Sequence, residues 1–141
     1  MDKDLALAKQ LLTTEEHTCV LCRDDRIYTS TRRGVAPLLG WLDSDLDLRG
    51  FCAADRVIGK ATAYLYCLLG VKEVFARVIS RPATQVLQNH SIPAHWDTLV
   101  EGIQNRQKTG PCPMEHATRN CTTPEEALAA VRQTLEALRQ S

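Results

Sequence analysis

The chain has 141 residues, 44% hydrophobic and 24% charged, and its 17 basic and 17 acidic side chains give a formal net charge of zero. This size and composition indicate one soluble globular domain over residues 1–141. A balanced charge provides no overall positive field, which argues against nucleic acid or an anionic membrane as the partner. No segment is apolar enough for an export signal or a membrane span, which favours the cytoplasm and reduced cysteines.

Hydrophobic spacing predicts a helix, a hairpin and a second helix in the first third of the chain. The hairpin would turn at Asp24-Asp25, between two short runs of β-forming residues. The second helix has Pro37 in its first turn, where a missing N–H costs little. The first helix is expected over residues 4–12, the hairpin strands over 18–23 and 26–29, and the second helix over 34–42.

The middle of the chain is predicted to begin with its longest helix, over residues 53–69, which Gly70 would end. Apolar side chains at helical spacing form its expected buried face: Val57, Ile58, Ala61, Leu65, Leu68 and Leu69. The segments predicted to follow are a strand over 73–80, a helix over 82–89, a short strand over 92–96 and a helix over 99–106.

The last helix carries the strongest local signals. Thr123 is placed to cap it, Pro124 fits its first position, and Glu126 completes a capping box. Its expected apolar stripe consists of Leu128, Val131, Leu135 and Leu138. A shorter helix is expected to begin near Met114. Helices that interleave with strands predict a three-layer α/β/α sandwich around a mixed central sheet.

Cys112 is the first candidate for a catalytic group. It precedes a predicted helix start, where the helix dipole favours a reactive thiolate. Arg106 is near in sequence and could add positive charge. The alternative is a small buried hydrophobe in a turn made rigid by Pro111 and Pro113.

Two carboxylates, Asp55 and Glu115, are the candidate acid–base pair. Carboxylates that converge in a cleft have different pKa values, which suits one to donate and the other to accept a proton. Both also lie where a first helical turn is predicted, a position in which acids are favoured by the dipole alone.

The predicted ligand contacts are Arg33, Lys60, Arg106 and Thr109. Arg32 and Arg33 precede Gly34 and could form an anion site at the start of the next helix, or simply lie on the surface. Lys60 could contact a phosphate, or be a solvated helix charge. His116 could shuttle a proton, although a surface position is equally compatible with its sequence context.

Cys19 and Cys22 have the spacing of a metal or redox pair. If they lie on a strand, side chains three residues apart point to opposite faces. The two sulfur atoms would then diverge, so we expect neither a shared metal ion nor a disulfide.

Three motifs resemble an uncharacterised bacterial family, domain of unknown function 1893. They are Arg33-Gly34-Val35-x-Pro37-Leu38, Ala54-Asp55-Arg56-Val57-Ile58-Gly59-Lys60-Ala61, and Asn105-Arg106-x-x-Thr109-Gly110-x-Cys112-Pro113-Met114-Glu115. The resemblance implies a cytidine-deaminase-like fold, a homodimer by analogy with that superfamily, and no established reaction.

Two segments resemble the motifs of zinc-dependent deaminases, Cys52-Ala53-Ala54-Asp55-Arg56-Val57 and Pro111-Cys112-Pro113-Met114-Glu115. In that alignment Ala53 and Glu115 occupy two of the three zinc-ligand positions, and only Cys112 is retained. The resemblance therefore implies no metal, no cofactor and no zinc-dependent deamination.

The sequence leads to two main functional hypotheses and a weaker third. The first is a pocket for a small polar metabolite, such as a nucleotide, in an enzyme that uses Cys112, Asp55 and Glu115. The second is a non-catalytic ligand-sensing or interaction module on the same fold. The third is an unusual metal site formed by the same three residues.

Overall fold

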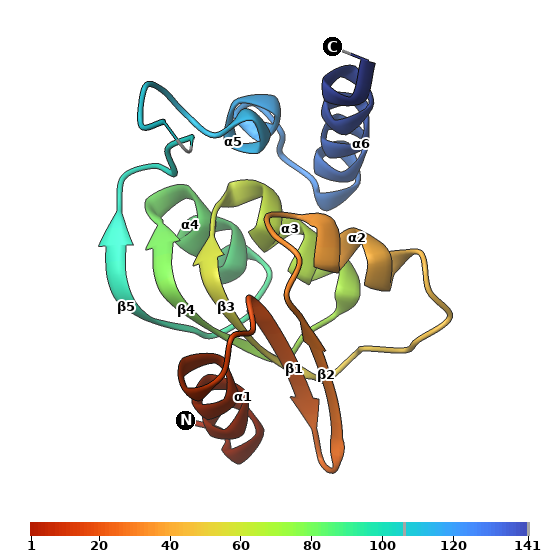
Figure 1. The fold of residues 1–141 in the computed structure, drawn as a ribbon, viewed down its shortest axis with the longest axis vertical. Helices are drawn as coiled ribbons and strands as arrows, with labels where there is room; N and C mark the ends of the chain where they lie inside the picture. The colour runs from red at the N-terminus through yellow and green to blue at the C-terminus, as the bar shows by residue number, and fades with distance from the viewer. Residues whose placement is uncertain (106, 141) are drawn as a thin grey trace.

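The computed structural model describes residues 1–105 and 107–140. This part of the chain forms five strands and six helices (Figure 1). The strands are β1 (Cys19–Arg23), β2 (Arg26–Ser30), β3 (Cys52–Ile58), β4 (Glu73–Ser80) and β5 (Ala94–Val100). The helices are α1 (Lys3–Thr14), α2 (Ala36–Leu42), α3 (Lys60–Leu69), α4 (Arg81–Asn89), α5 (Pro113–Thr118) and α6 (Pro124–Gln140).

The strands form one mixed sheet in the order β2-β1-β3-β4-β5. β1 is antiparallel to both β2 and β3, whereas β3, β4 and β5 are parallel to one another. The β1–β2 connection is a two-residue turn in which Asp24 has a positive φ of 55°, a conformation that Asp tolerates in hairpin turns. β3 consequently lies in the middle of the sheet, with α3 following directly from its end.

The two faces of the sheet are covered unequally. On one face α1 packs its buried side chains Leu5, Ala8 and Leu12 against β1, β3 and β4. The opposite face holds the larger apolar core, to which α2, α3, α4 and α6 contribute buried residues. Figure 1 shows α1 alone on its side of the sheet. None of the helices in the described ranges is both long and apolar enough to cross a bilayer.

Several local predictions are confirmed. The hairpin, the strand over Glu73–Ser80 and the Gly70 helix end are present, and Gly70 has the left-handed φ of 74°. At the start of α6 the Glu126 N–H donates to Thr123 Oγ1 at 3.1 Å. Cys19 and Cys22 belong to the cores on opposite faces of the sheet, so their sulfur atoms do diverge.

The helix predicted over residues 53–69 is wrong. Its first part is the strand β3, and only the part after Gly59 is helical. Ala53 and Ala54 are fully buried, because β3 is covered on both faces. A strand buried on both faces lacks the alternation of polar and apolar residues that identifies a half-buried strand. Apolar residues at helical spacing therefore extended the prediction backwards across Gly59.

The helix predicted over residues 99–106 is also wrong. Leu99 and Val100 pair with Ile79 and Ser80, so they extend β5 rather than begin a helix. In the last helix the predicted stripe is only partly buried. Val131 is buried, whereas Leu138 is 51% exposed.

Candidate functional site

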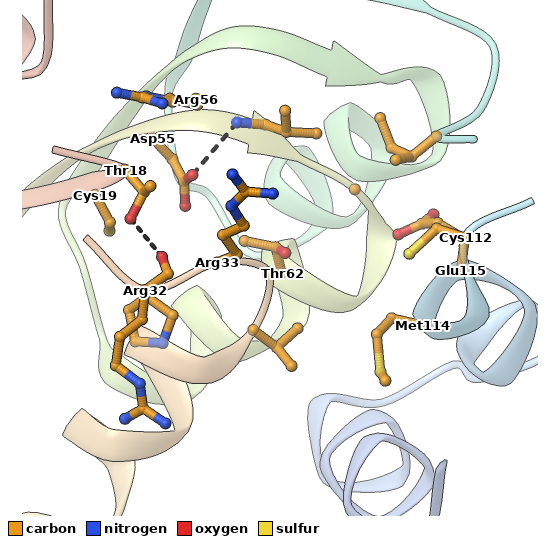
Figure 2. A pocket seen from close by; sticks show the side chains of 16 residues that line it. Thr18, Cys19, Arg32, Arg33, Asp55, Arg56, Thr62, Cys112, Met114 and Glu115 are labelled. Carbon is orange, nitrogen blue, oxygen red and sulfur yellow. Dashed lines mark hydrogen bonds between the residues drawn. The ribbon is translucent and has the colours of Figure 1, made fainter. Parts of the chain in front are cut away.

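A cavity of about 290 Å³ lies at the carboxyl end of β3 (Figure 2). Its walls come from the start of β1, the loop before α2, the β3–α3 junction and the first turn of α5. The described residues that line it are Thr18, Cys19, Arg32, Arg33, Gly34, Val35, Pro37, Asp55, Arg56, Val57, Gly59, Thr62, Ile103, Cys112, Met114 and Glu115.

Asp55 forms part of the cavity wall but is almost wholly buried, with 8% of its surface exposed. The Tyr66 hydroxyl donates to Asp55 Oδ2 at 2.6 Å, and the Val57 N–H donates to Oδ1 at 3.3 Å. Burial raises the pKa of Asp55 to about 6, although these hydrogen bonds to the carboxylate oppose the shift. Asp55 can therefore change its protonation state near neutral pH.

A buried chain of hydrogen bonds extends from Asp55 into the core. The sulfur of Cys19 lies 2.9 Å from the Tyr66 hydroxyl oxygen. The Cys19 thiol also hydrogen-bonds to Asp55, so Cys19, Tyr66 and Asp55 form one buried group. Burial raises the pKa of both Cys19 and Tyr66 well above the usual values, so both remain protonated.

Glu115 caps helix α3. Its Oε2 accepts the Lys60 N–H at 3.0 Å and its Oε1 accepts the Ala61 N–H at 3.4 Å. These are two of the N–H groups that a helix start leaves without a partner. Burial raises the pKa of Glu115, and the two backbone donors oppose that effect. The carboxylate predicted to act in acid–base chemistry is thus held by the backbone.

Gly59 allows this contact. A Cβ at position 59 would overlap Glu115 Oε1 and would lie 2.6 Å from Cδ of the same side chain. As the residue before α3, Gly59 also has no side chain with which to cap the helix itself. The cap is therefore supplied by a residue 55 positions later than Lys60.

Cys112 precedes α5, where the sequence predicted a helix start. It is half-buried and lines the cavity, and its N–H donates to the Ile103 carbonyl at 2.9 Å. In Figure 2 Cys112 and Glu115 lie on the same side of the cavity, opposite Asp55. In the described part of the chain, Asp55, Cys112 and Glu115 do not gather their ligand atoms within 4.8 Å of one another. The geometry therefore does not support the metal site suggested for these three residues.

Arg33 extends its guanidinium into the cavity, near Asp55 (Figure 2). Arg32 and Arg56 lie at the same cavity. Within residues 1–105 and 107–140, none of these three arginine side chains has an ion-pair or hydrogen-bond partner. All three arginines are exposed. The guanidinium of Arg32 lies towards Gly40 of α2, and that of Arg56 points away from the cavity in Figure 2. Arg33 is therefore the arginine that brings positive charge into the cavity.

The other predicted contacts are not at the cavity wall. Lys60 Nζ donates to the Arg119 carbonyl at 2.8 Å, at the end of α5. Thr109 is exposed and its hydroxyl accepts from the Asn105 amide at 3.1 Å. His116 is exposed. Arg106 lies outside the described residues, and the role of all these side chains in binding stays a prediction.

Sequence reasoning missed Tyr66, Cys19, Thr18 and Arg56 as cavity or near-cavity residues. Tyr66 had one usable signal, since a tyrosine on a buried helix face needs a partner for its hydroxyl. Thr18 Oγ1 donates to the Ser30 carbonyl at 3.0 Å and also to that of Arg32. These contacts fix the loop that carries Arg33. No local sequence pattern predicts them, because the partners are 12 and 14 residues away.

The family described as Domain of unknown function (DUF1893) matches residues 7–135, so the chain belongs to that family. The crystal structure of a DUF1893 family protein from Thermotoga maritima has a similar fold, with a TM-score of 0.85 over 94% of this chain and 91% of that chain. The two sequences are 20% identical, so the likeness shows the fold alone. No curated protein sequence matches the chain.

We expect Gly59→Ala to destabilise the protein by about 1 to 3 kcal/mol, because the new methyl group displaces Glu115 and leaves two partly buried N–H groups without their carboxylate partner. Urea unfolding measures the change. Gly102→Ala is the matched control, since its added Cβ meets no atom within 4 Å. In a Glu115→Ala background, Gly59→Ala should cost much less, and an undiminished cost would contradict this explanation.

Asp55 should make stability depend on pH. Its folded-state pKa of about 6 lies above the ordinary 3.8, so the folded state holds the proton more tightly than the unfolded state. Its contribution is complete below about pH 4 and is lost as the pH rises through 6. Compared with Asp55→Asn, the wild-type protein should lose roughly 2 to 3 kcal/mol of unfolding free energy between pH 4 and 7.

Urea unfolding of both proteins across this pH range tests the Asp55 prediction. The exposed Asp45→Asn is the control, because it removes the same charge without removing a buried carboxyl. If the unfolding free energy of the wild type, relative to that of Asp55→Asn, instead increased with pH, the native state would favour the ionised Asp55 and the prediction would be wrong.

Proposed function

We propose that this protein binds a small anionic metabolite, such as a nucleotide, in the cavity at the end of β3, and does so without zinc. The observation that carries the proposal is that one cavity holds both an exposed guanidinium with no protein partner among the described residues and a buried carboxyl group. Arg33 supplies the first and Asp55 the second. Pockets that recognise small molecules commonly combine apolar walls with a few such fixed polar groups.

The polar groups of the cavity match a ligand that has an acidic group at one end and N–H donors at the other. A guanidinium binds phosphate or carboxylate through two parallel hydrogen bonds. An ionised Asp55 accepts hydrogen bonds from amino or ring N–H groups. Val57 and Met114 add apolar surface to the cavity wall. A nucleoside monophosphate has a phosphate, an apolar ring face and N–H donors.

We also propose the three-layer, deaminase-like description of the fold. It is supported by a mixed sheet that carries α1 on one face and the larger helical core on the other. The motif resemblance supports it less, because residues Cys52–Ile58 form the strand β3 rather than the start of a helix. The proposed homodimer rests on the resemblance alone.

In the enzymatic version of the proposal, Cys112 acts on the bound ligand and Asp55 exchanges a proton with it. A carboxyl group with a pKa near 6 is suited to general acid–base catalysis at neutral pH. Glu115 holds the start of α3 and so positions Cys112 beside it. The non-catalytic version keeps the Arg33 and Asp55 contacts and assigns Cys112 no reaction.

Calorimetric titration with nucleoside monophosphates and with inorganic phosphate tests binding. We expect at least one nucleotide to bind, and Arg33→Gln to weaken it at least tenfold, because a charged hydrogen bond contributes about 1.5 to 3 kcal/mol. Arg77→Gln is the control, since Arg77 is an exposed arginine outside the cavity. Equal binding by wild type and Arg33→Gln, or none by wild type, would refute the proposal.

Cys112 distinguishes the two versions. If it is a nucleophile, iodoacetamide should modify it faster than Cys67 and Cys121, which are also half-buried, and peptide mass spectrometry measures all three rates. Bound nucleotide should then slow the modification of Cys112. If Cys112 is alkylated no faster than the other two thiols, and Cys112→Ala binds nucleotide normally, the non-catalytic version is correct.

A further inference from the structure

A second group of polar side chains lies at the amino ends of β3 and β4, the opposite end of β3 from the cavity. Carboxylate oxygens of Asp2 and Glu73 and the sulfur of Cys52 all lie within 4.8 Å of one another. No other such group of three ligand atoms occurs in the described residues. Asp2 caps α1, Cys52 begins β3 and Glu73 begins β4, so the fold itself assembles the group.

Two of the three positions follow from strand register. Cys52 and Glu73 begin β3 and β4, and they are direct partners in this parallel pair. Side chains of register partners point to the same face of a sheet. For Cys52 this is the face that α1 covers.

Asp2 is fixed at the start of α1. Its Oδ1 accepts the Asp4 N–H at 2.8 Å and so caps the helix. Helix α1 packs on β3 and β4 through Leu5, and this packing brings the cap to the edge where Cys52 and Glu73 begin. Oδ2 remains directed away from the cap and towards other partners.

Cys52 is the residue that most needs an explanation. It is only 1% exposed, and no hydrogen-bond partner for its thiol occurs in the described part of the chain. A buried thiol without a partner could be a small hydrophobe. Here, however, it faces two carboxylates, and a divalent cation would serve as a common partner for all three.

We propose that Asp2, Cys52 and Glu73 bind a thiophilic divalent cation of the zinc class. One sulfur and two carboxylate oxygens are ligands that zinc accepts, and water would complete a four-coordinate site. The side chains of Asp2 and Glu73 are 22% and 13% exposed, which leaves the ion a path from solvent. The thiol proton leaves to the solvent when the sulfur binds the cation.

His95 supports Glu73 in this site. Its Nε2 lies 2.5 Å from Glu73 Oε2, a contact from β5 that holds one carboxylate oxygen and leaves the other for a cation. Hydrogen bonds from neighbouring side chains commonly orient metal ligands in this way. The bound cation would tie the first turn of α1 to two strands, so we infer a structural role.

Lys72 competes with the cation for the Asp2 carboxylate. Its Nζ lies 2.7 Å from Asp2 Oδ2, where it occupies the oxygen that the cation needs. The Lys72 side chain is 59% exposed, so it can move into solvent without losing a buried position. Removal of its charge should therefore strengthen cation binding rather than weaken it.

Titration of the full chain with Co²⁺, after treatment with a chelator, tests the proposal. A Co²⁺–thiolate bond gives a charge-transfer absorption band, and calorimetry gives the affinity. We expect one ion per chain, a band that is lost in Cys52→Ala, and at least a tenfold weaker affinity in Glu73→Gln. Lys72→Met should bind several-fold more tightly. Cys22→Ala should retain the band, because Cys22 is a buried cysteine paired with Cys52 in the sheet but outside the ligand group.

Three results would overturn the proposal: no Co²⁺ binding by the wild-type chain, a thiolate band that persists in Cys52→Ala, or weaker binding by Lys72→Met. Glu73→Gln keeps every apolar contact of the region, so it tests the site even if Cys52→Ala folds poorly. A zinc-dependent rise in the unfolding temperature of the wild type, absent in Glu73→Gln, would support the structural role.

Discussion

The contact between the Glu115 carboxylate and the first N–H groups of α3 is the interaction on which the cavity depends. It joins the β3–α3 junction to the segment that carries Cys112, although these parts are more than fifty residues apart in sequence. Gly59 makes the approach possible because it has no Cβ. The hydrogen bonds of Lys60 Nζ to the Arg119 carbonyl and of the Cys112 N–H to the Ile103 carbonyl also hold α5, but the Glu115 contact is the one that ties its first turn to the β3–α3 junction at the cavity.

The second constraint is the burial of Asp55. A carboxyl group in the core is costly when charged, and the protein reduces that cost by hydrogen bonds from Tyr66 and Cys19. The result is a group that is held in one position yet can change its charge near neutral pH. Arg33, which has no partner among the described residues, lies nearby in the same cavity. A buried acid and an exposed arginine in one cavity are the two groups on which the proposed ligand binding rests.

β3 connects the two regions of interest. Its carboxyl end lines the cavity, and its first residue, Cys52, belongs to the group with Asp2 and Glu73. The parallel pairing of β3 with β4 aligns both strand starts at one edge, while the β3–α3 junction directs two backbone N–H groups towards Glu115. The central strand therefore positions both candidate sites. Because it is buried on both faces, its sequence lacks the polar–apolar alternation by which a strand is recognised.

The sequence by itself determined the elements whose signals are local: the hairpin at Asp24-Asp25, the strand over Glu73–Ser80 and the capped start of α6. It also singled out Asp55, Cys112, Glu115 and Arg33, which the fold brings to one cavity. Only the tertiary structure decided that residues 52–58 are a strand, that Glu115 caps a helix and that Tyr66 holds Asp55. Each of these depends on partners distant in sequence: β1 and β4 for β3, Lys60 for Glu115, Cys19 for Tyr66. Local periodicity carries no information about such partners, because burial on both faces and long-range hydrogen bonds arise only when the chain has folded.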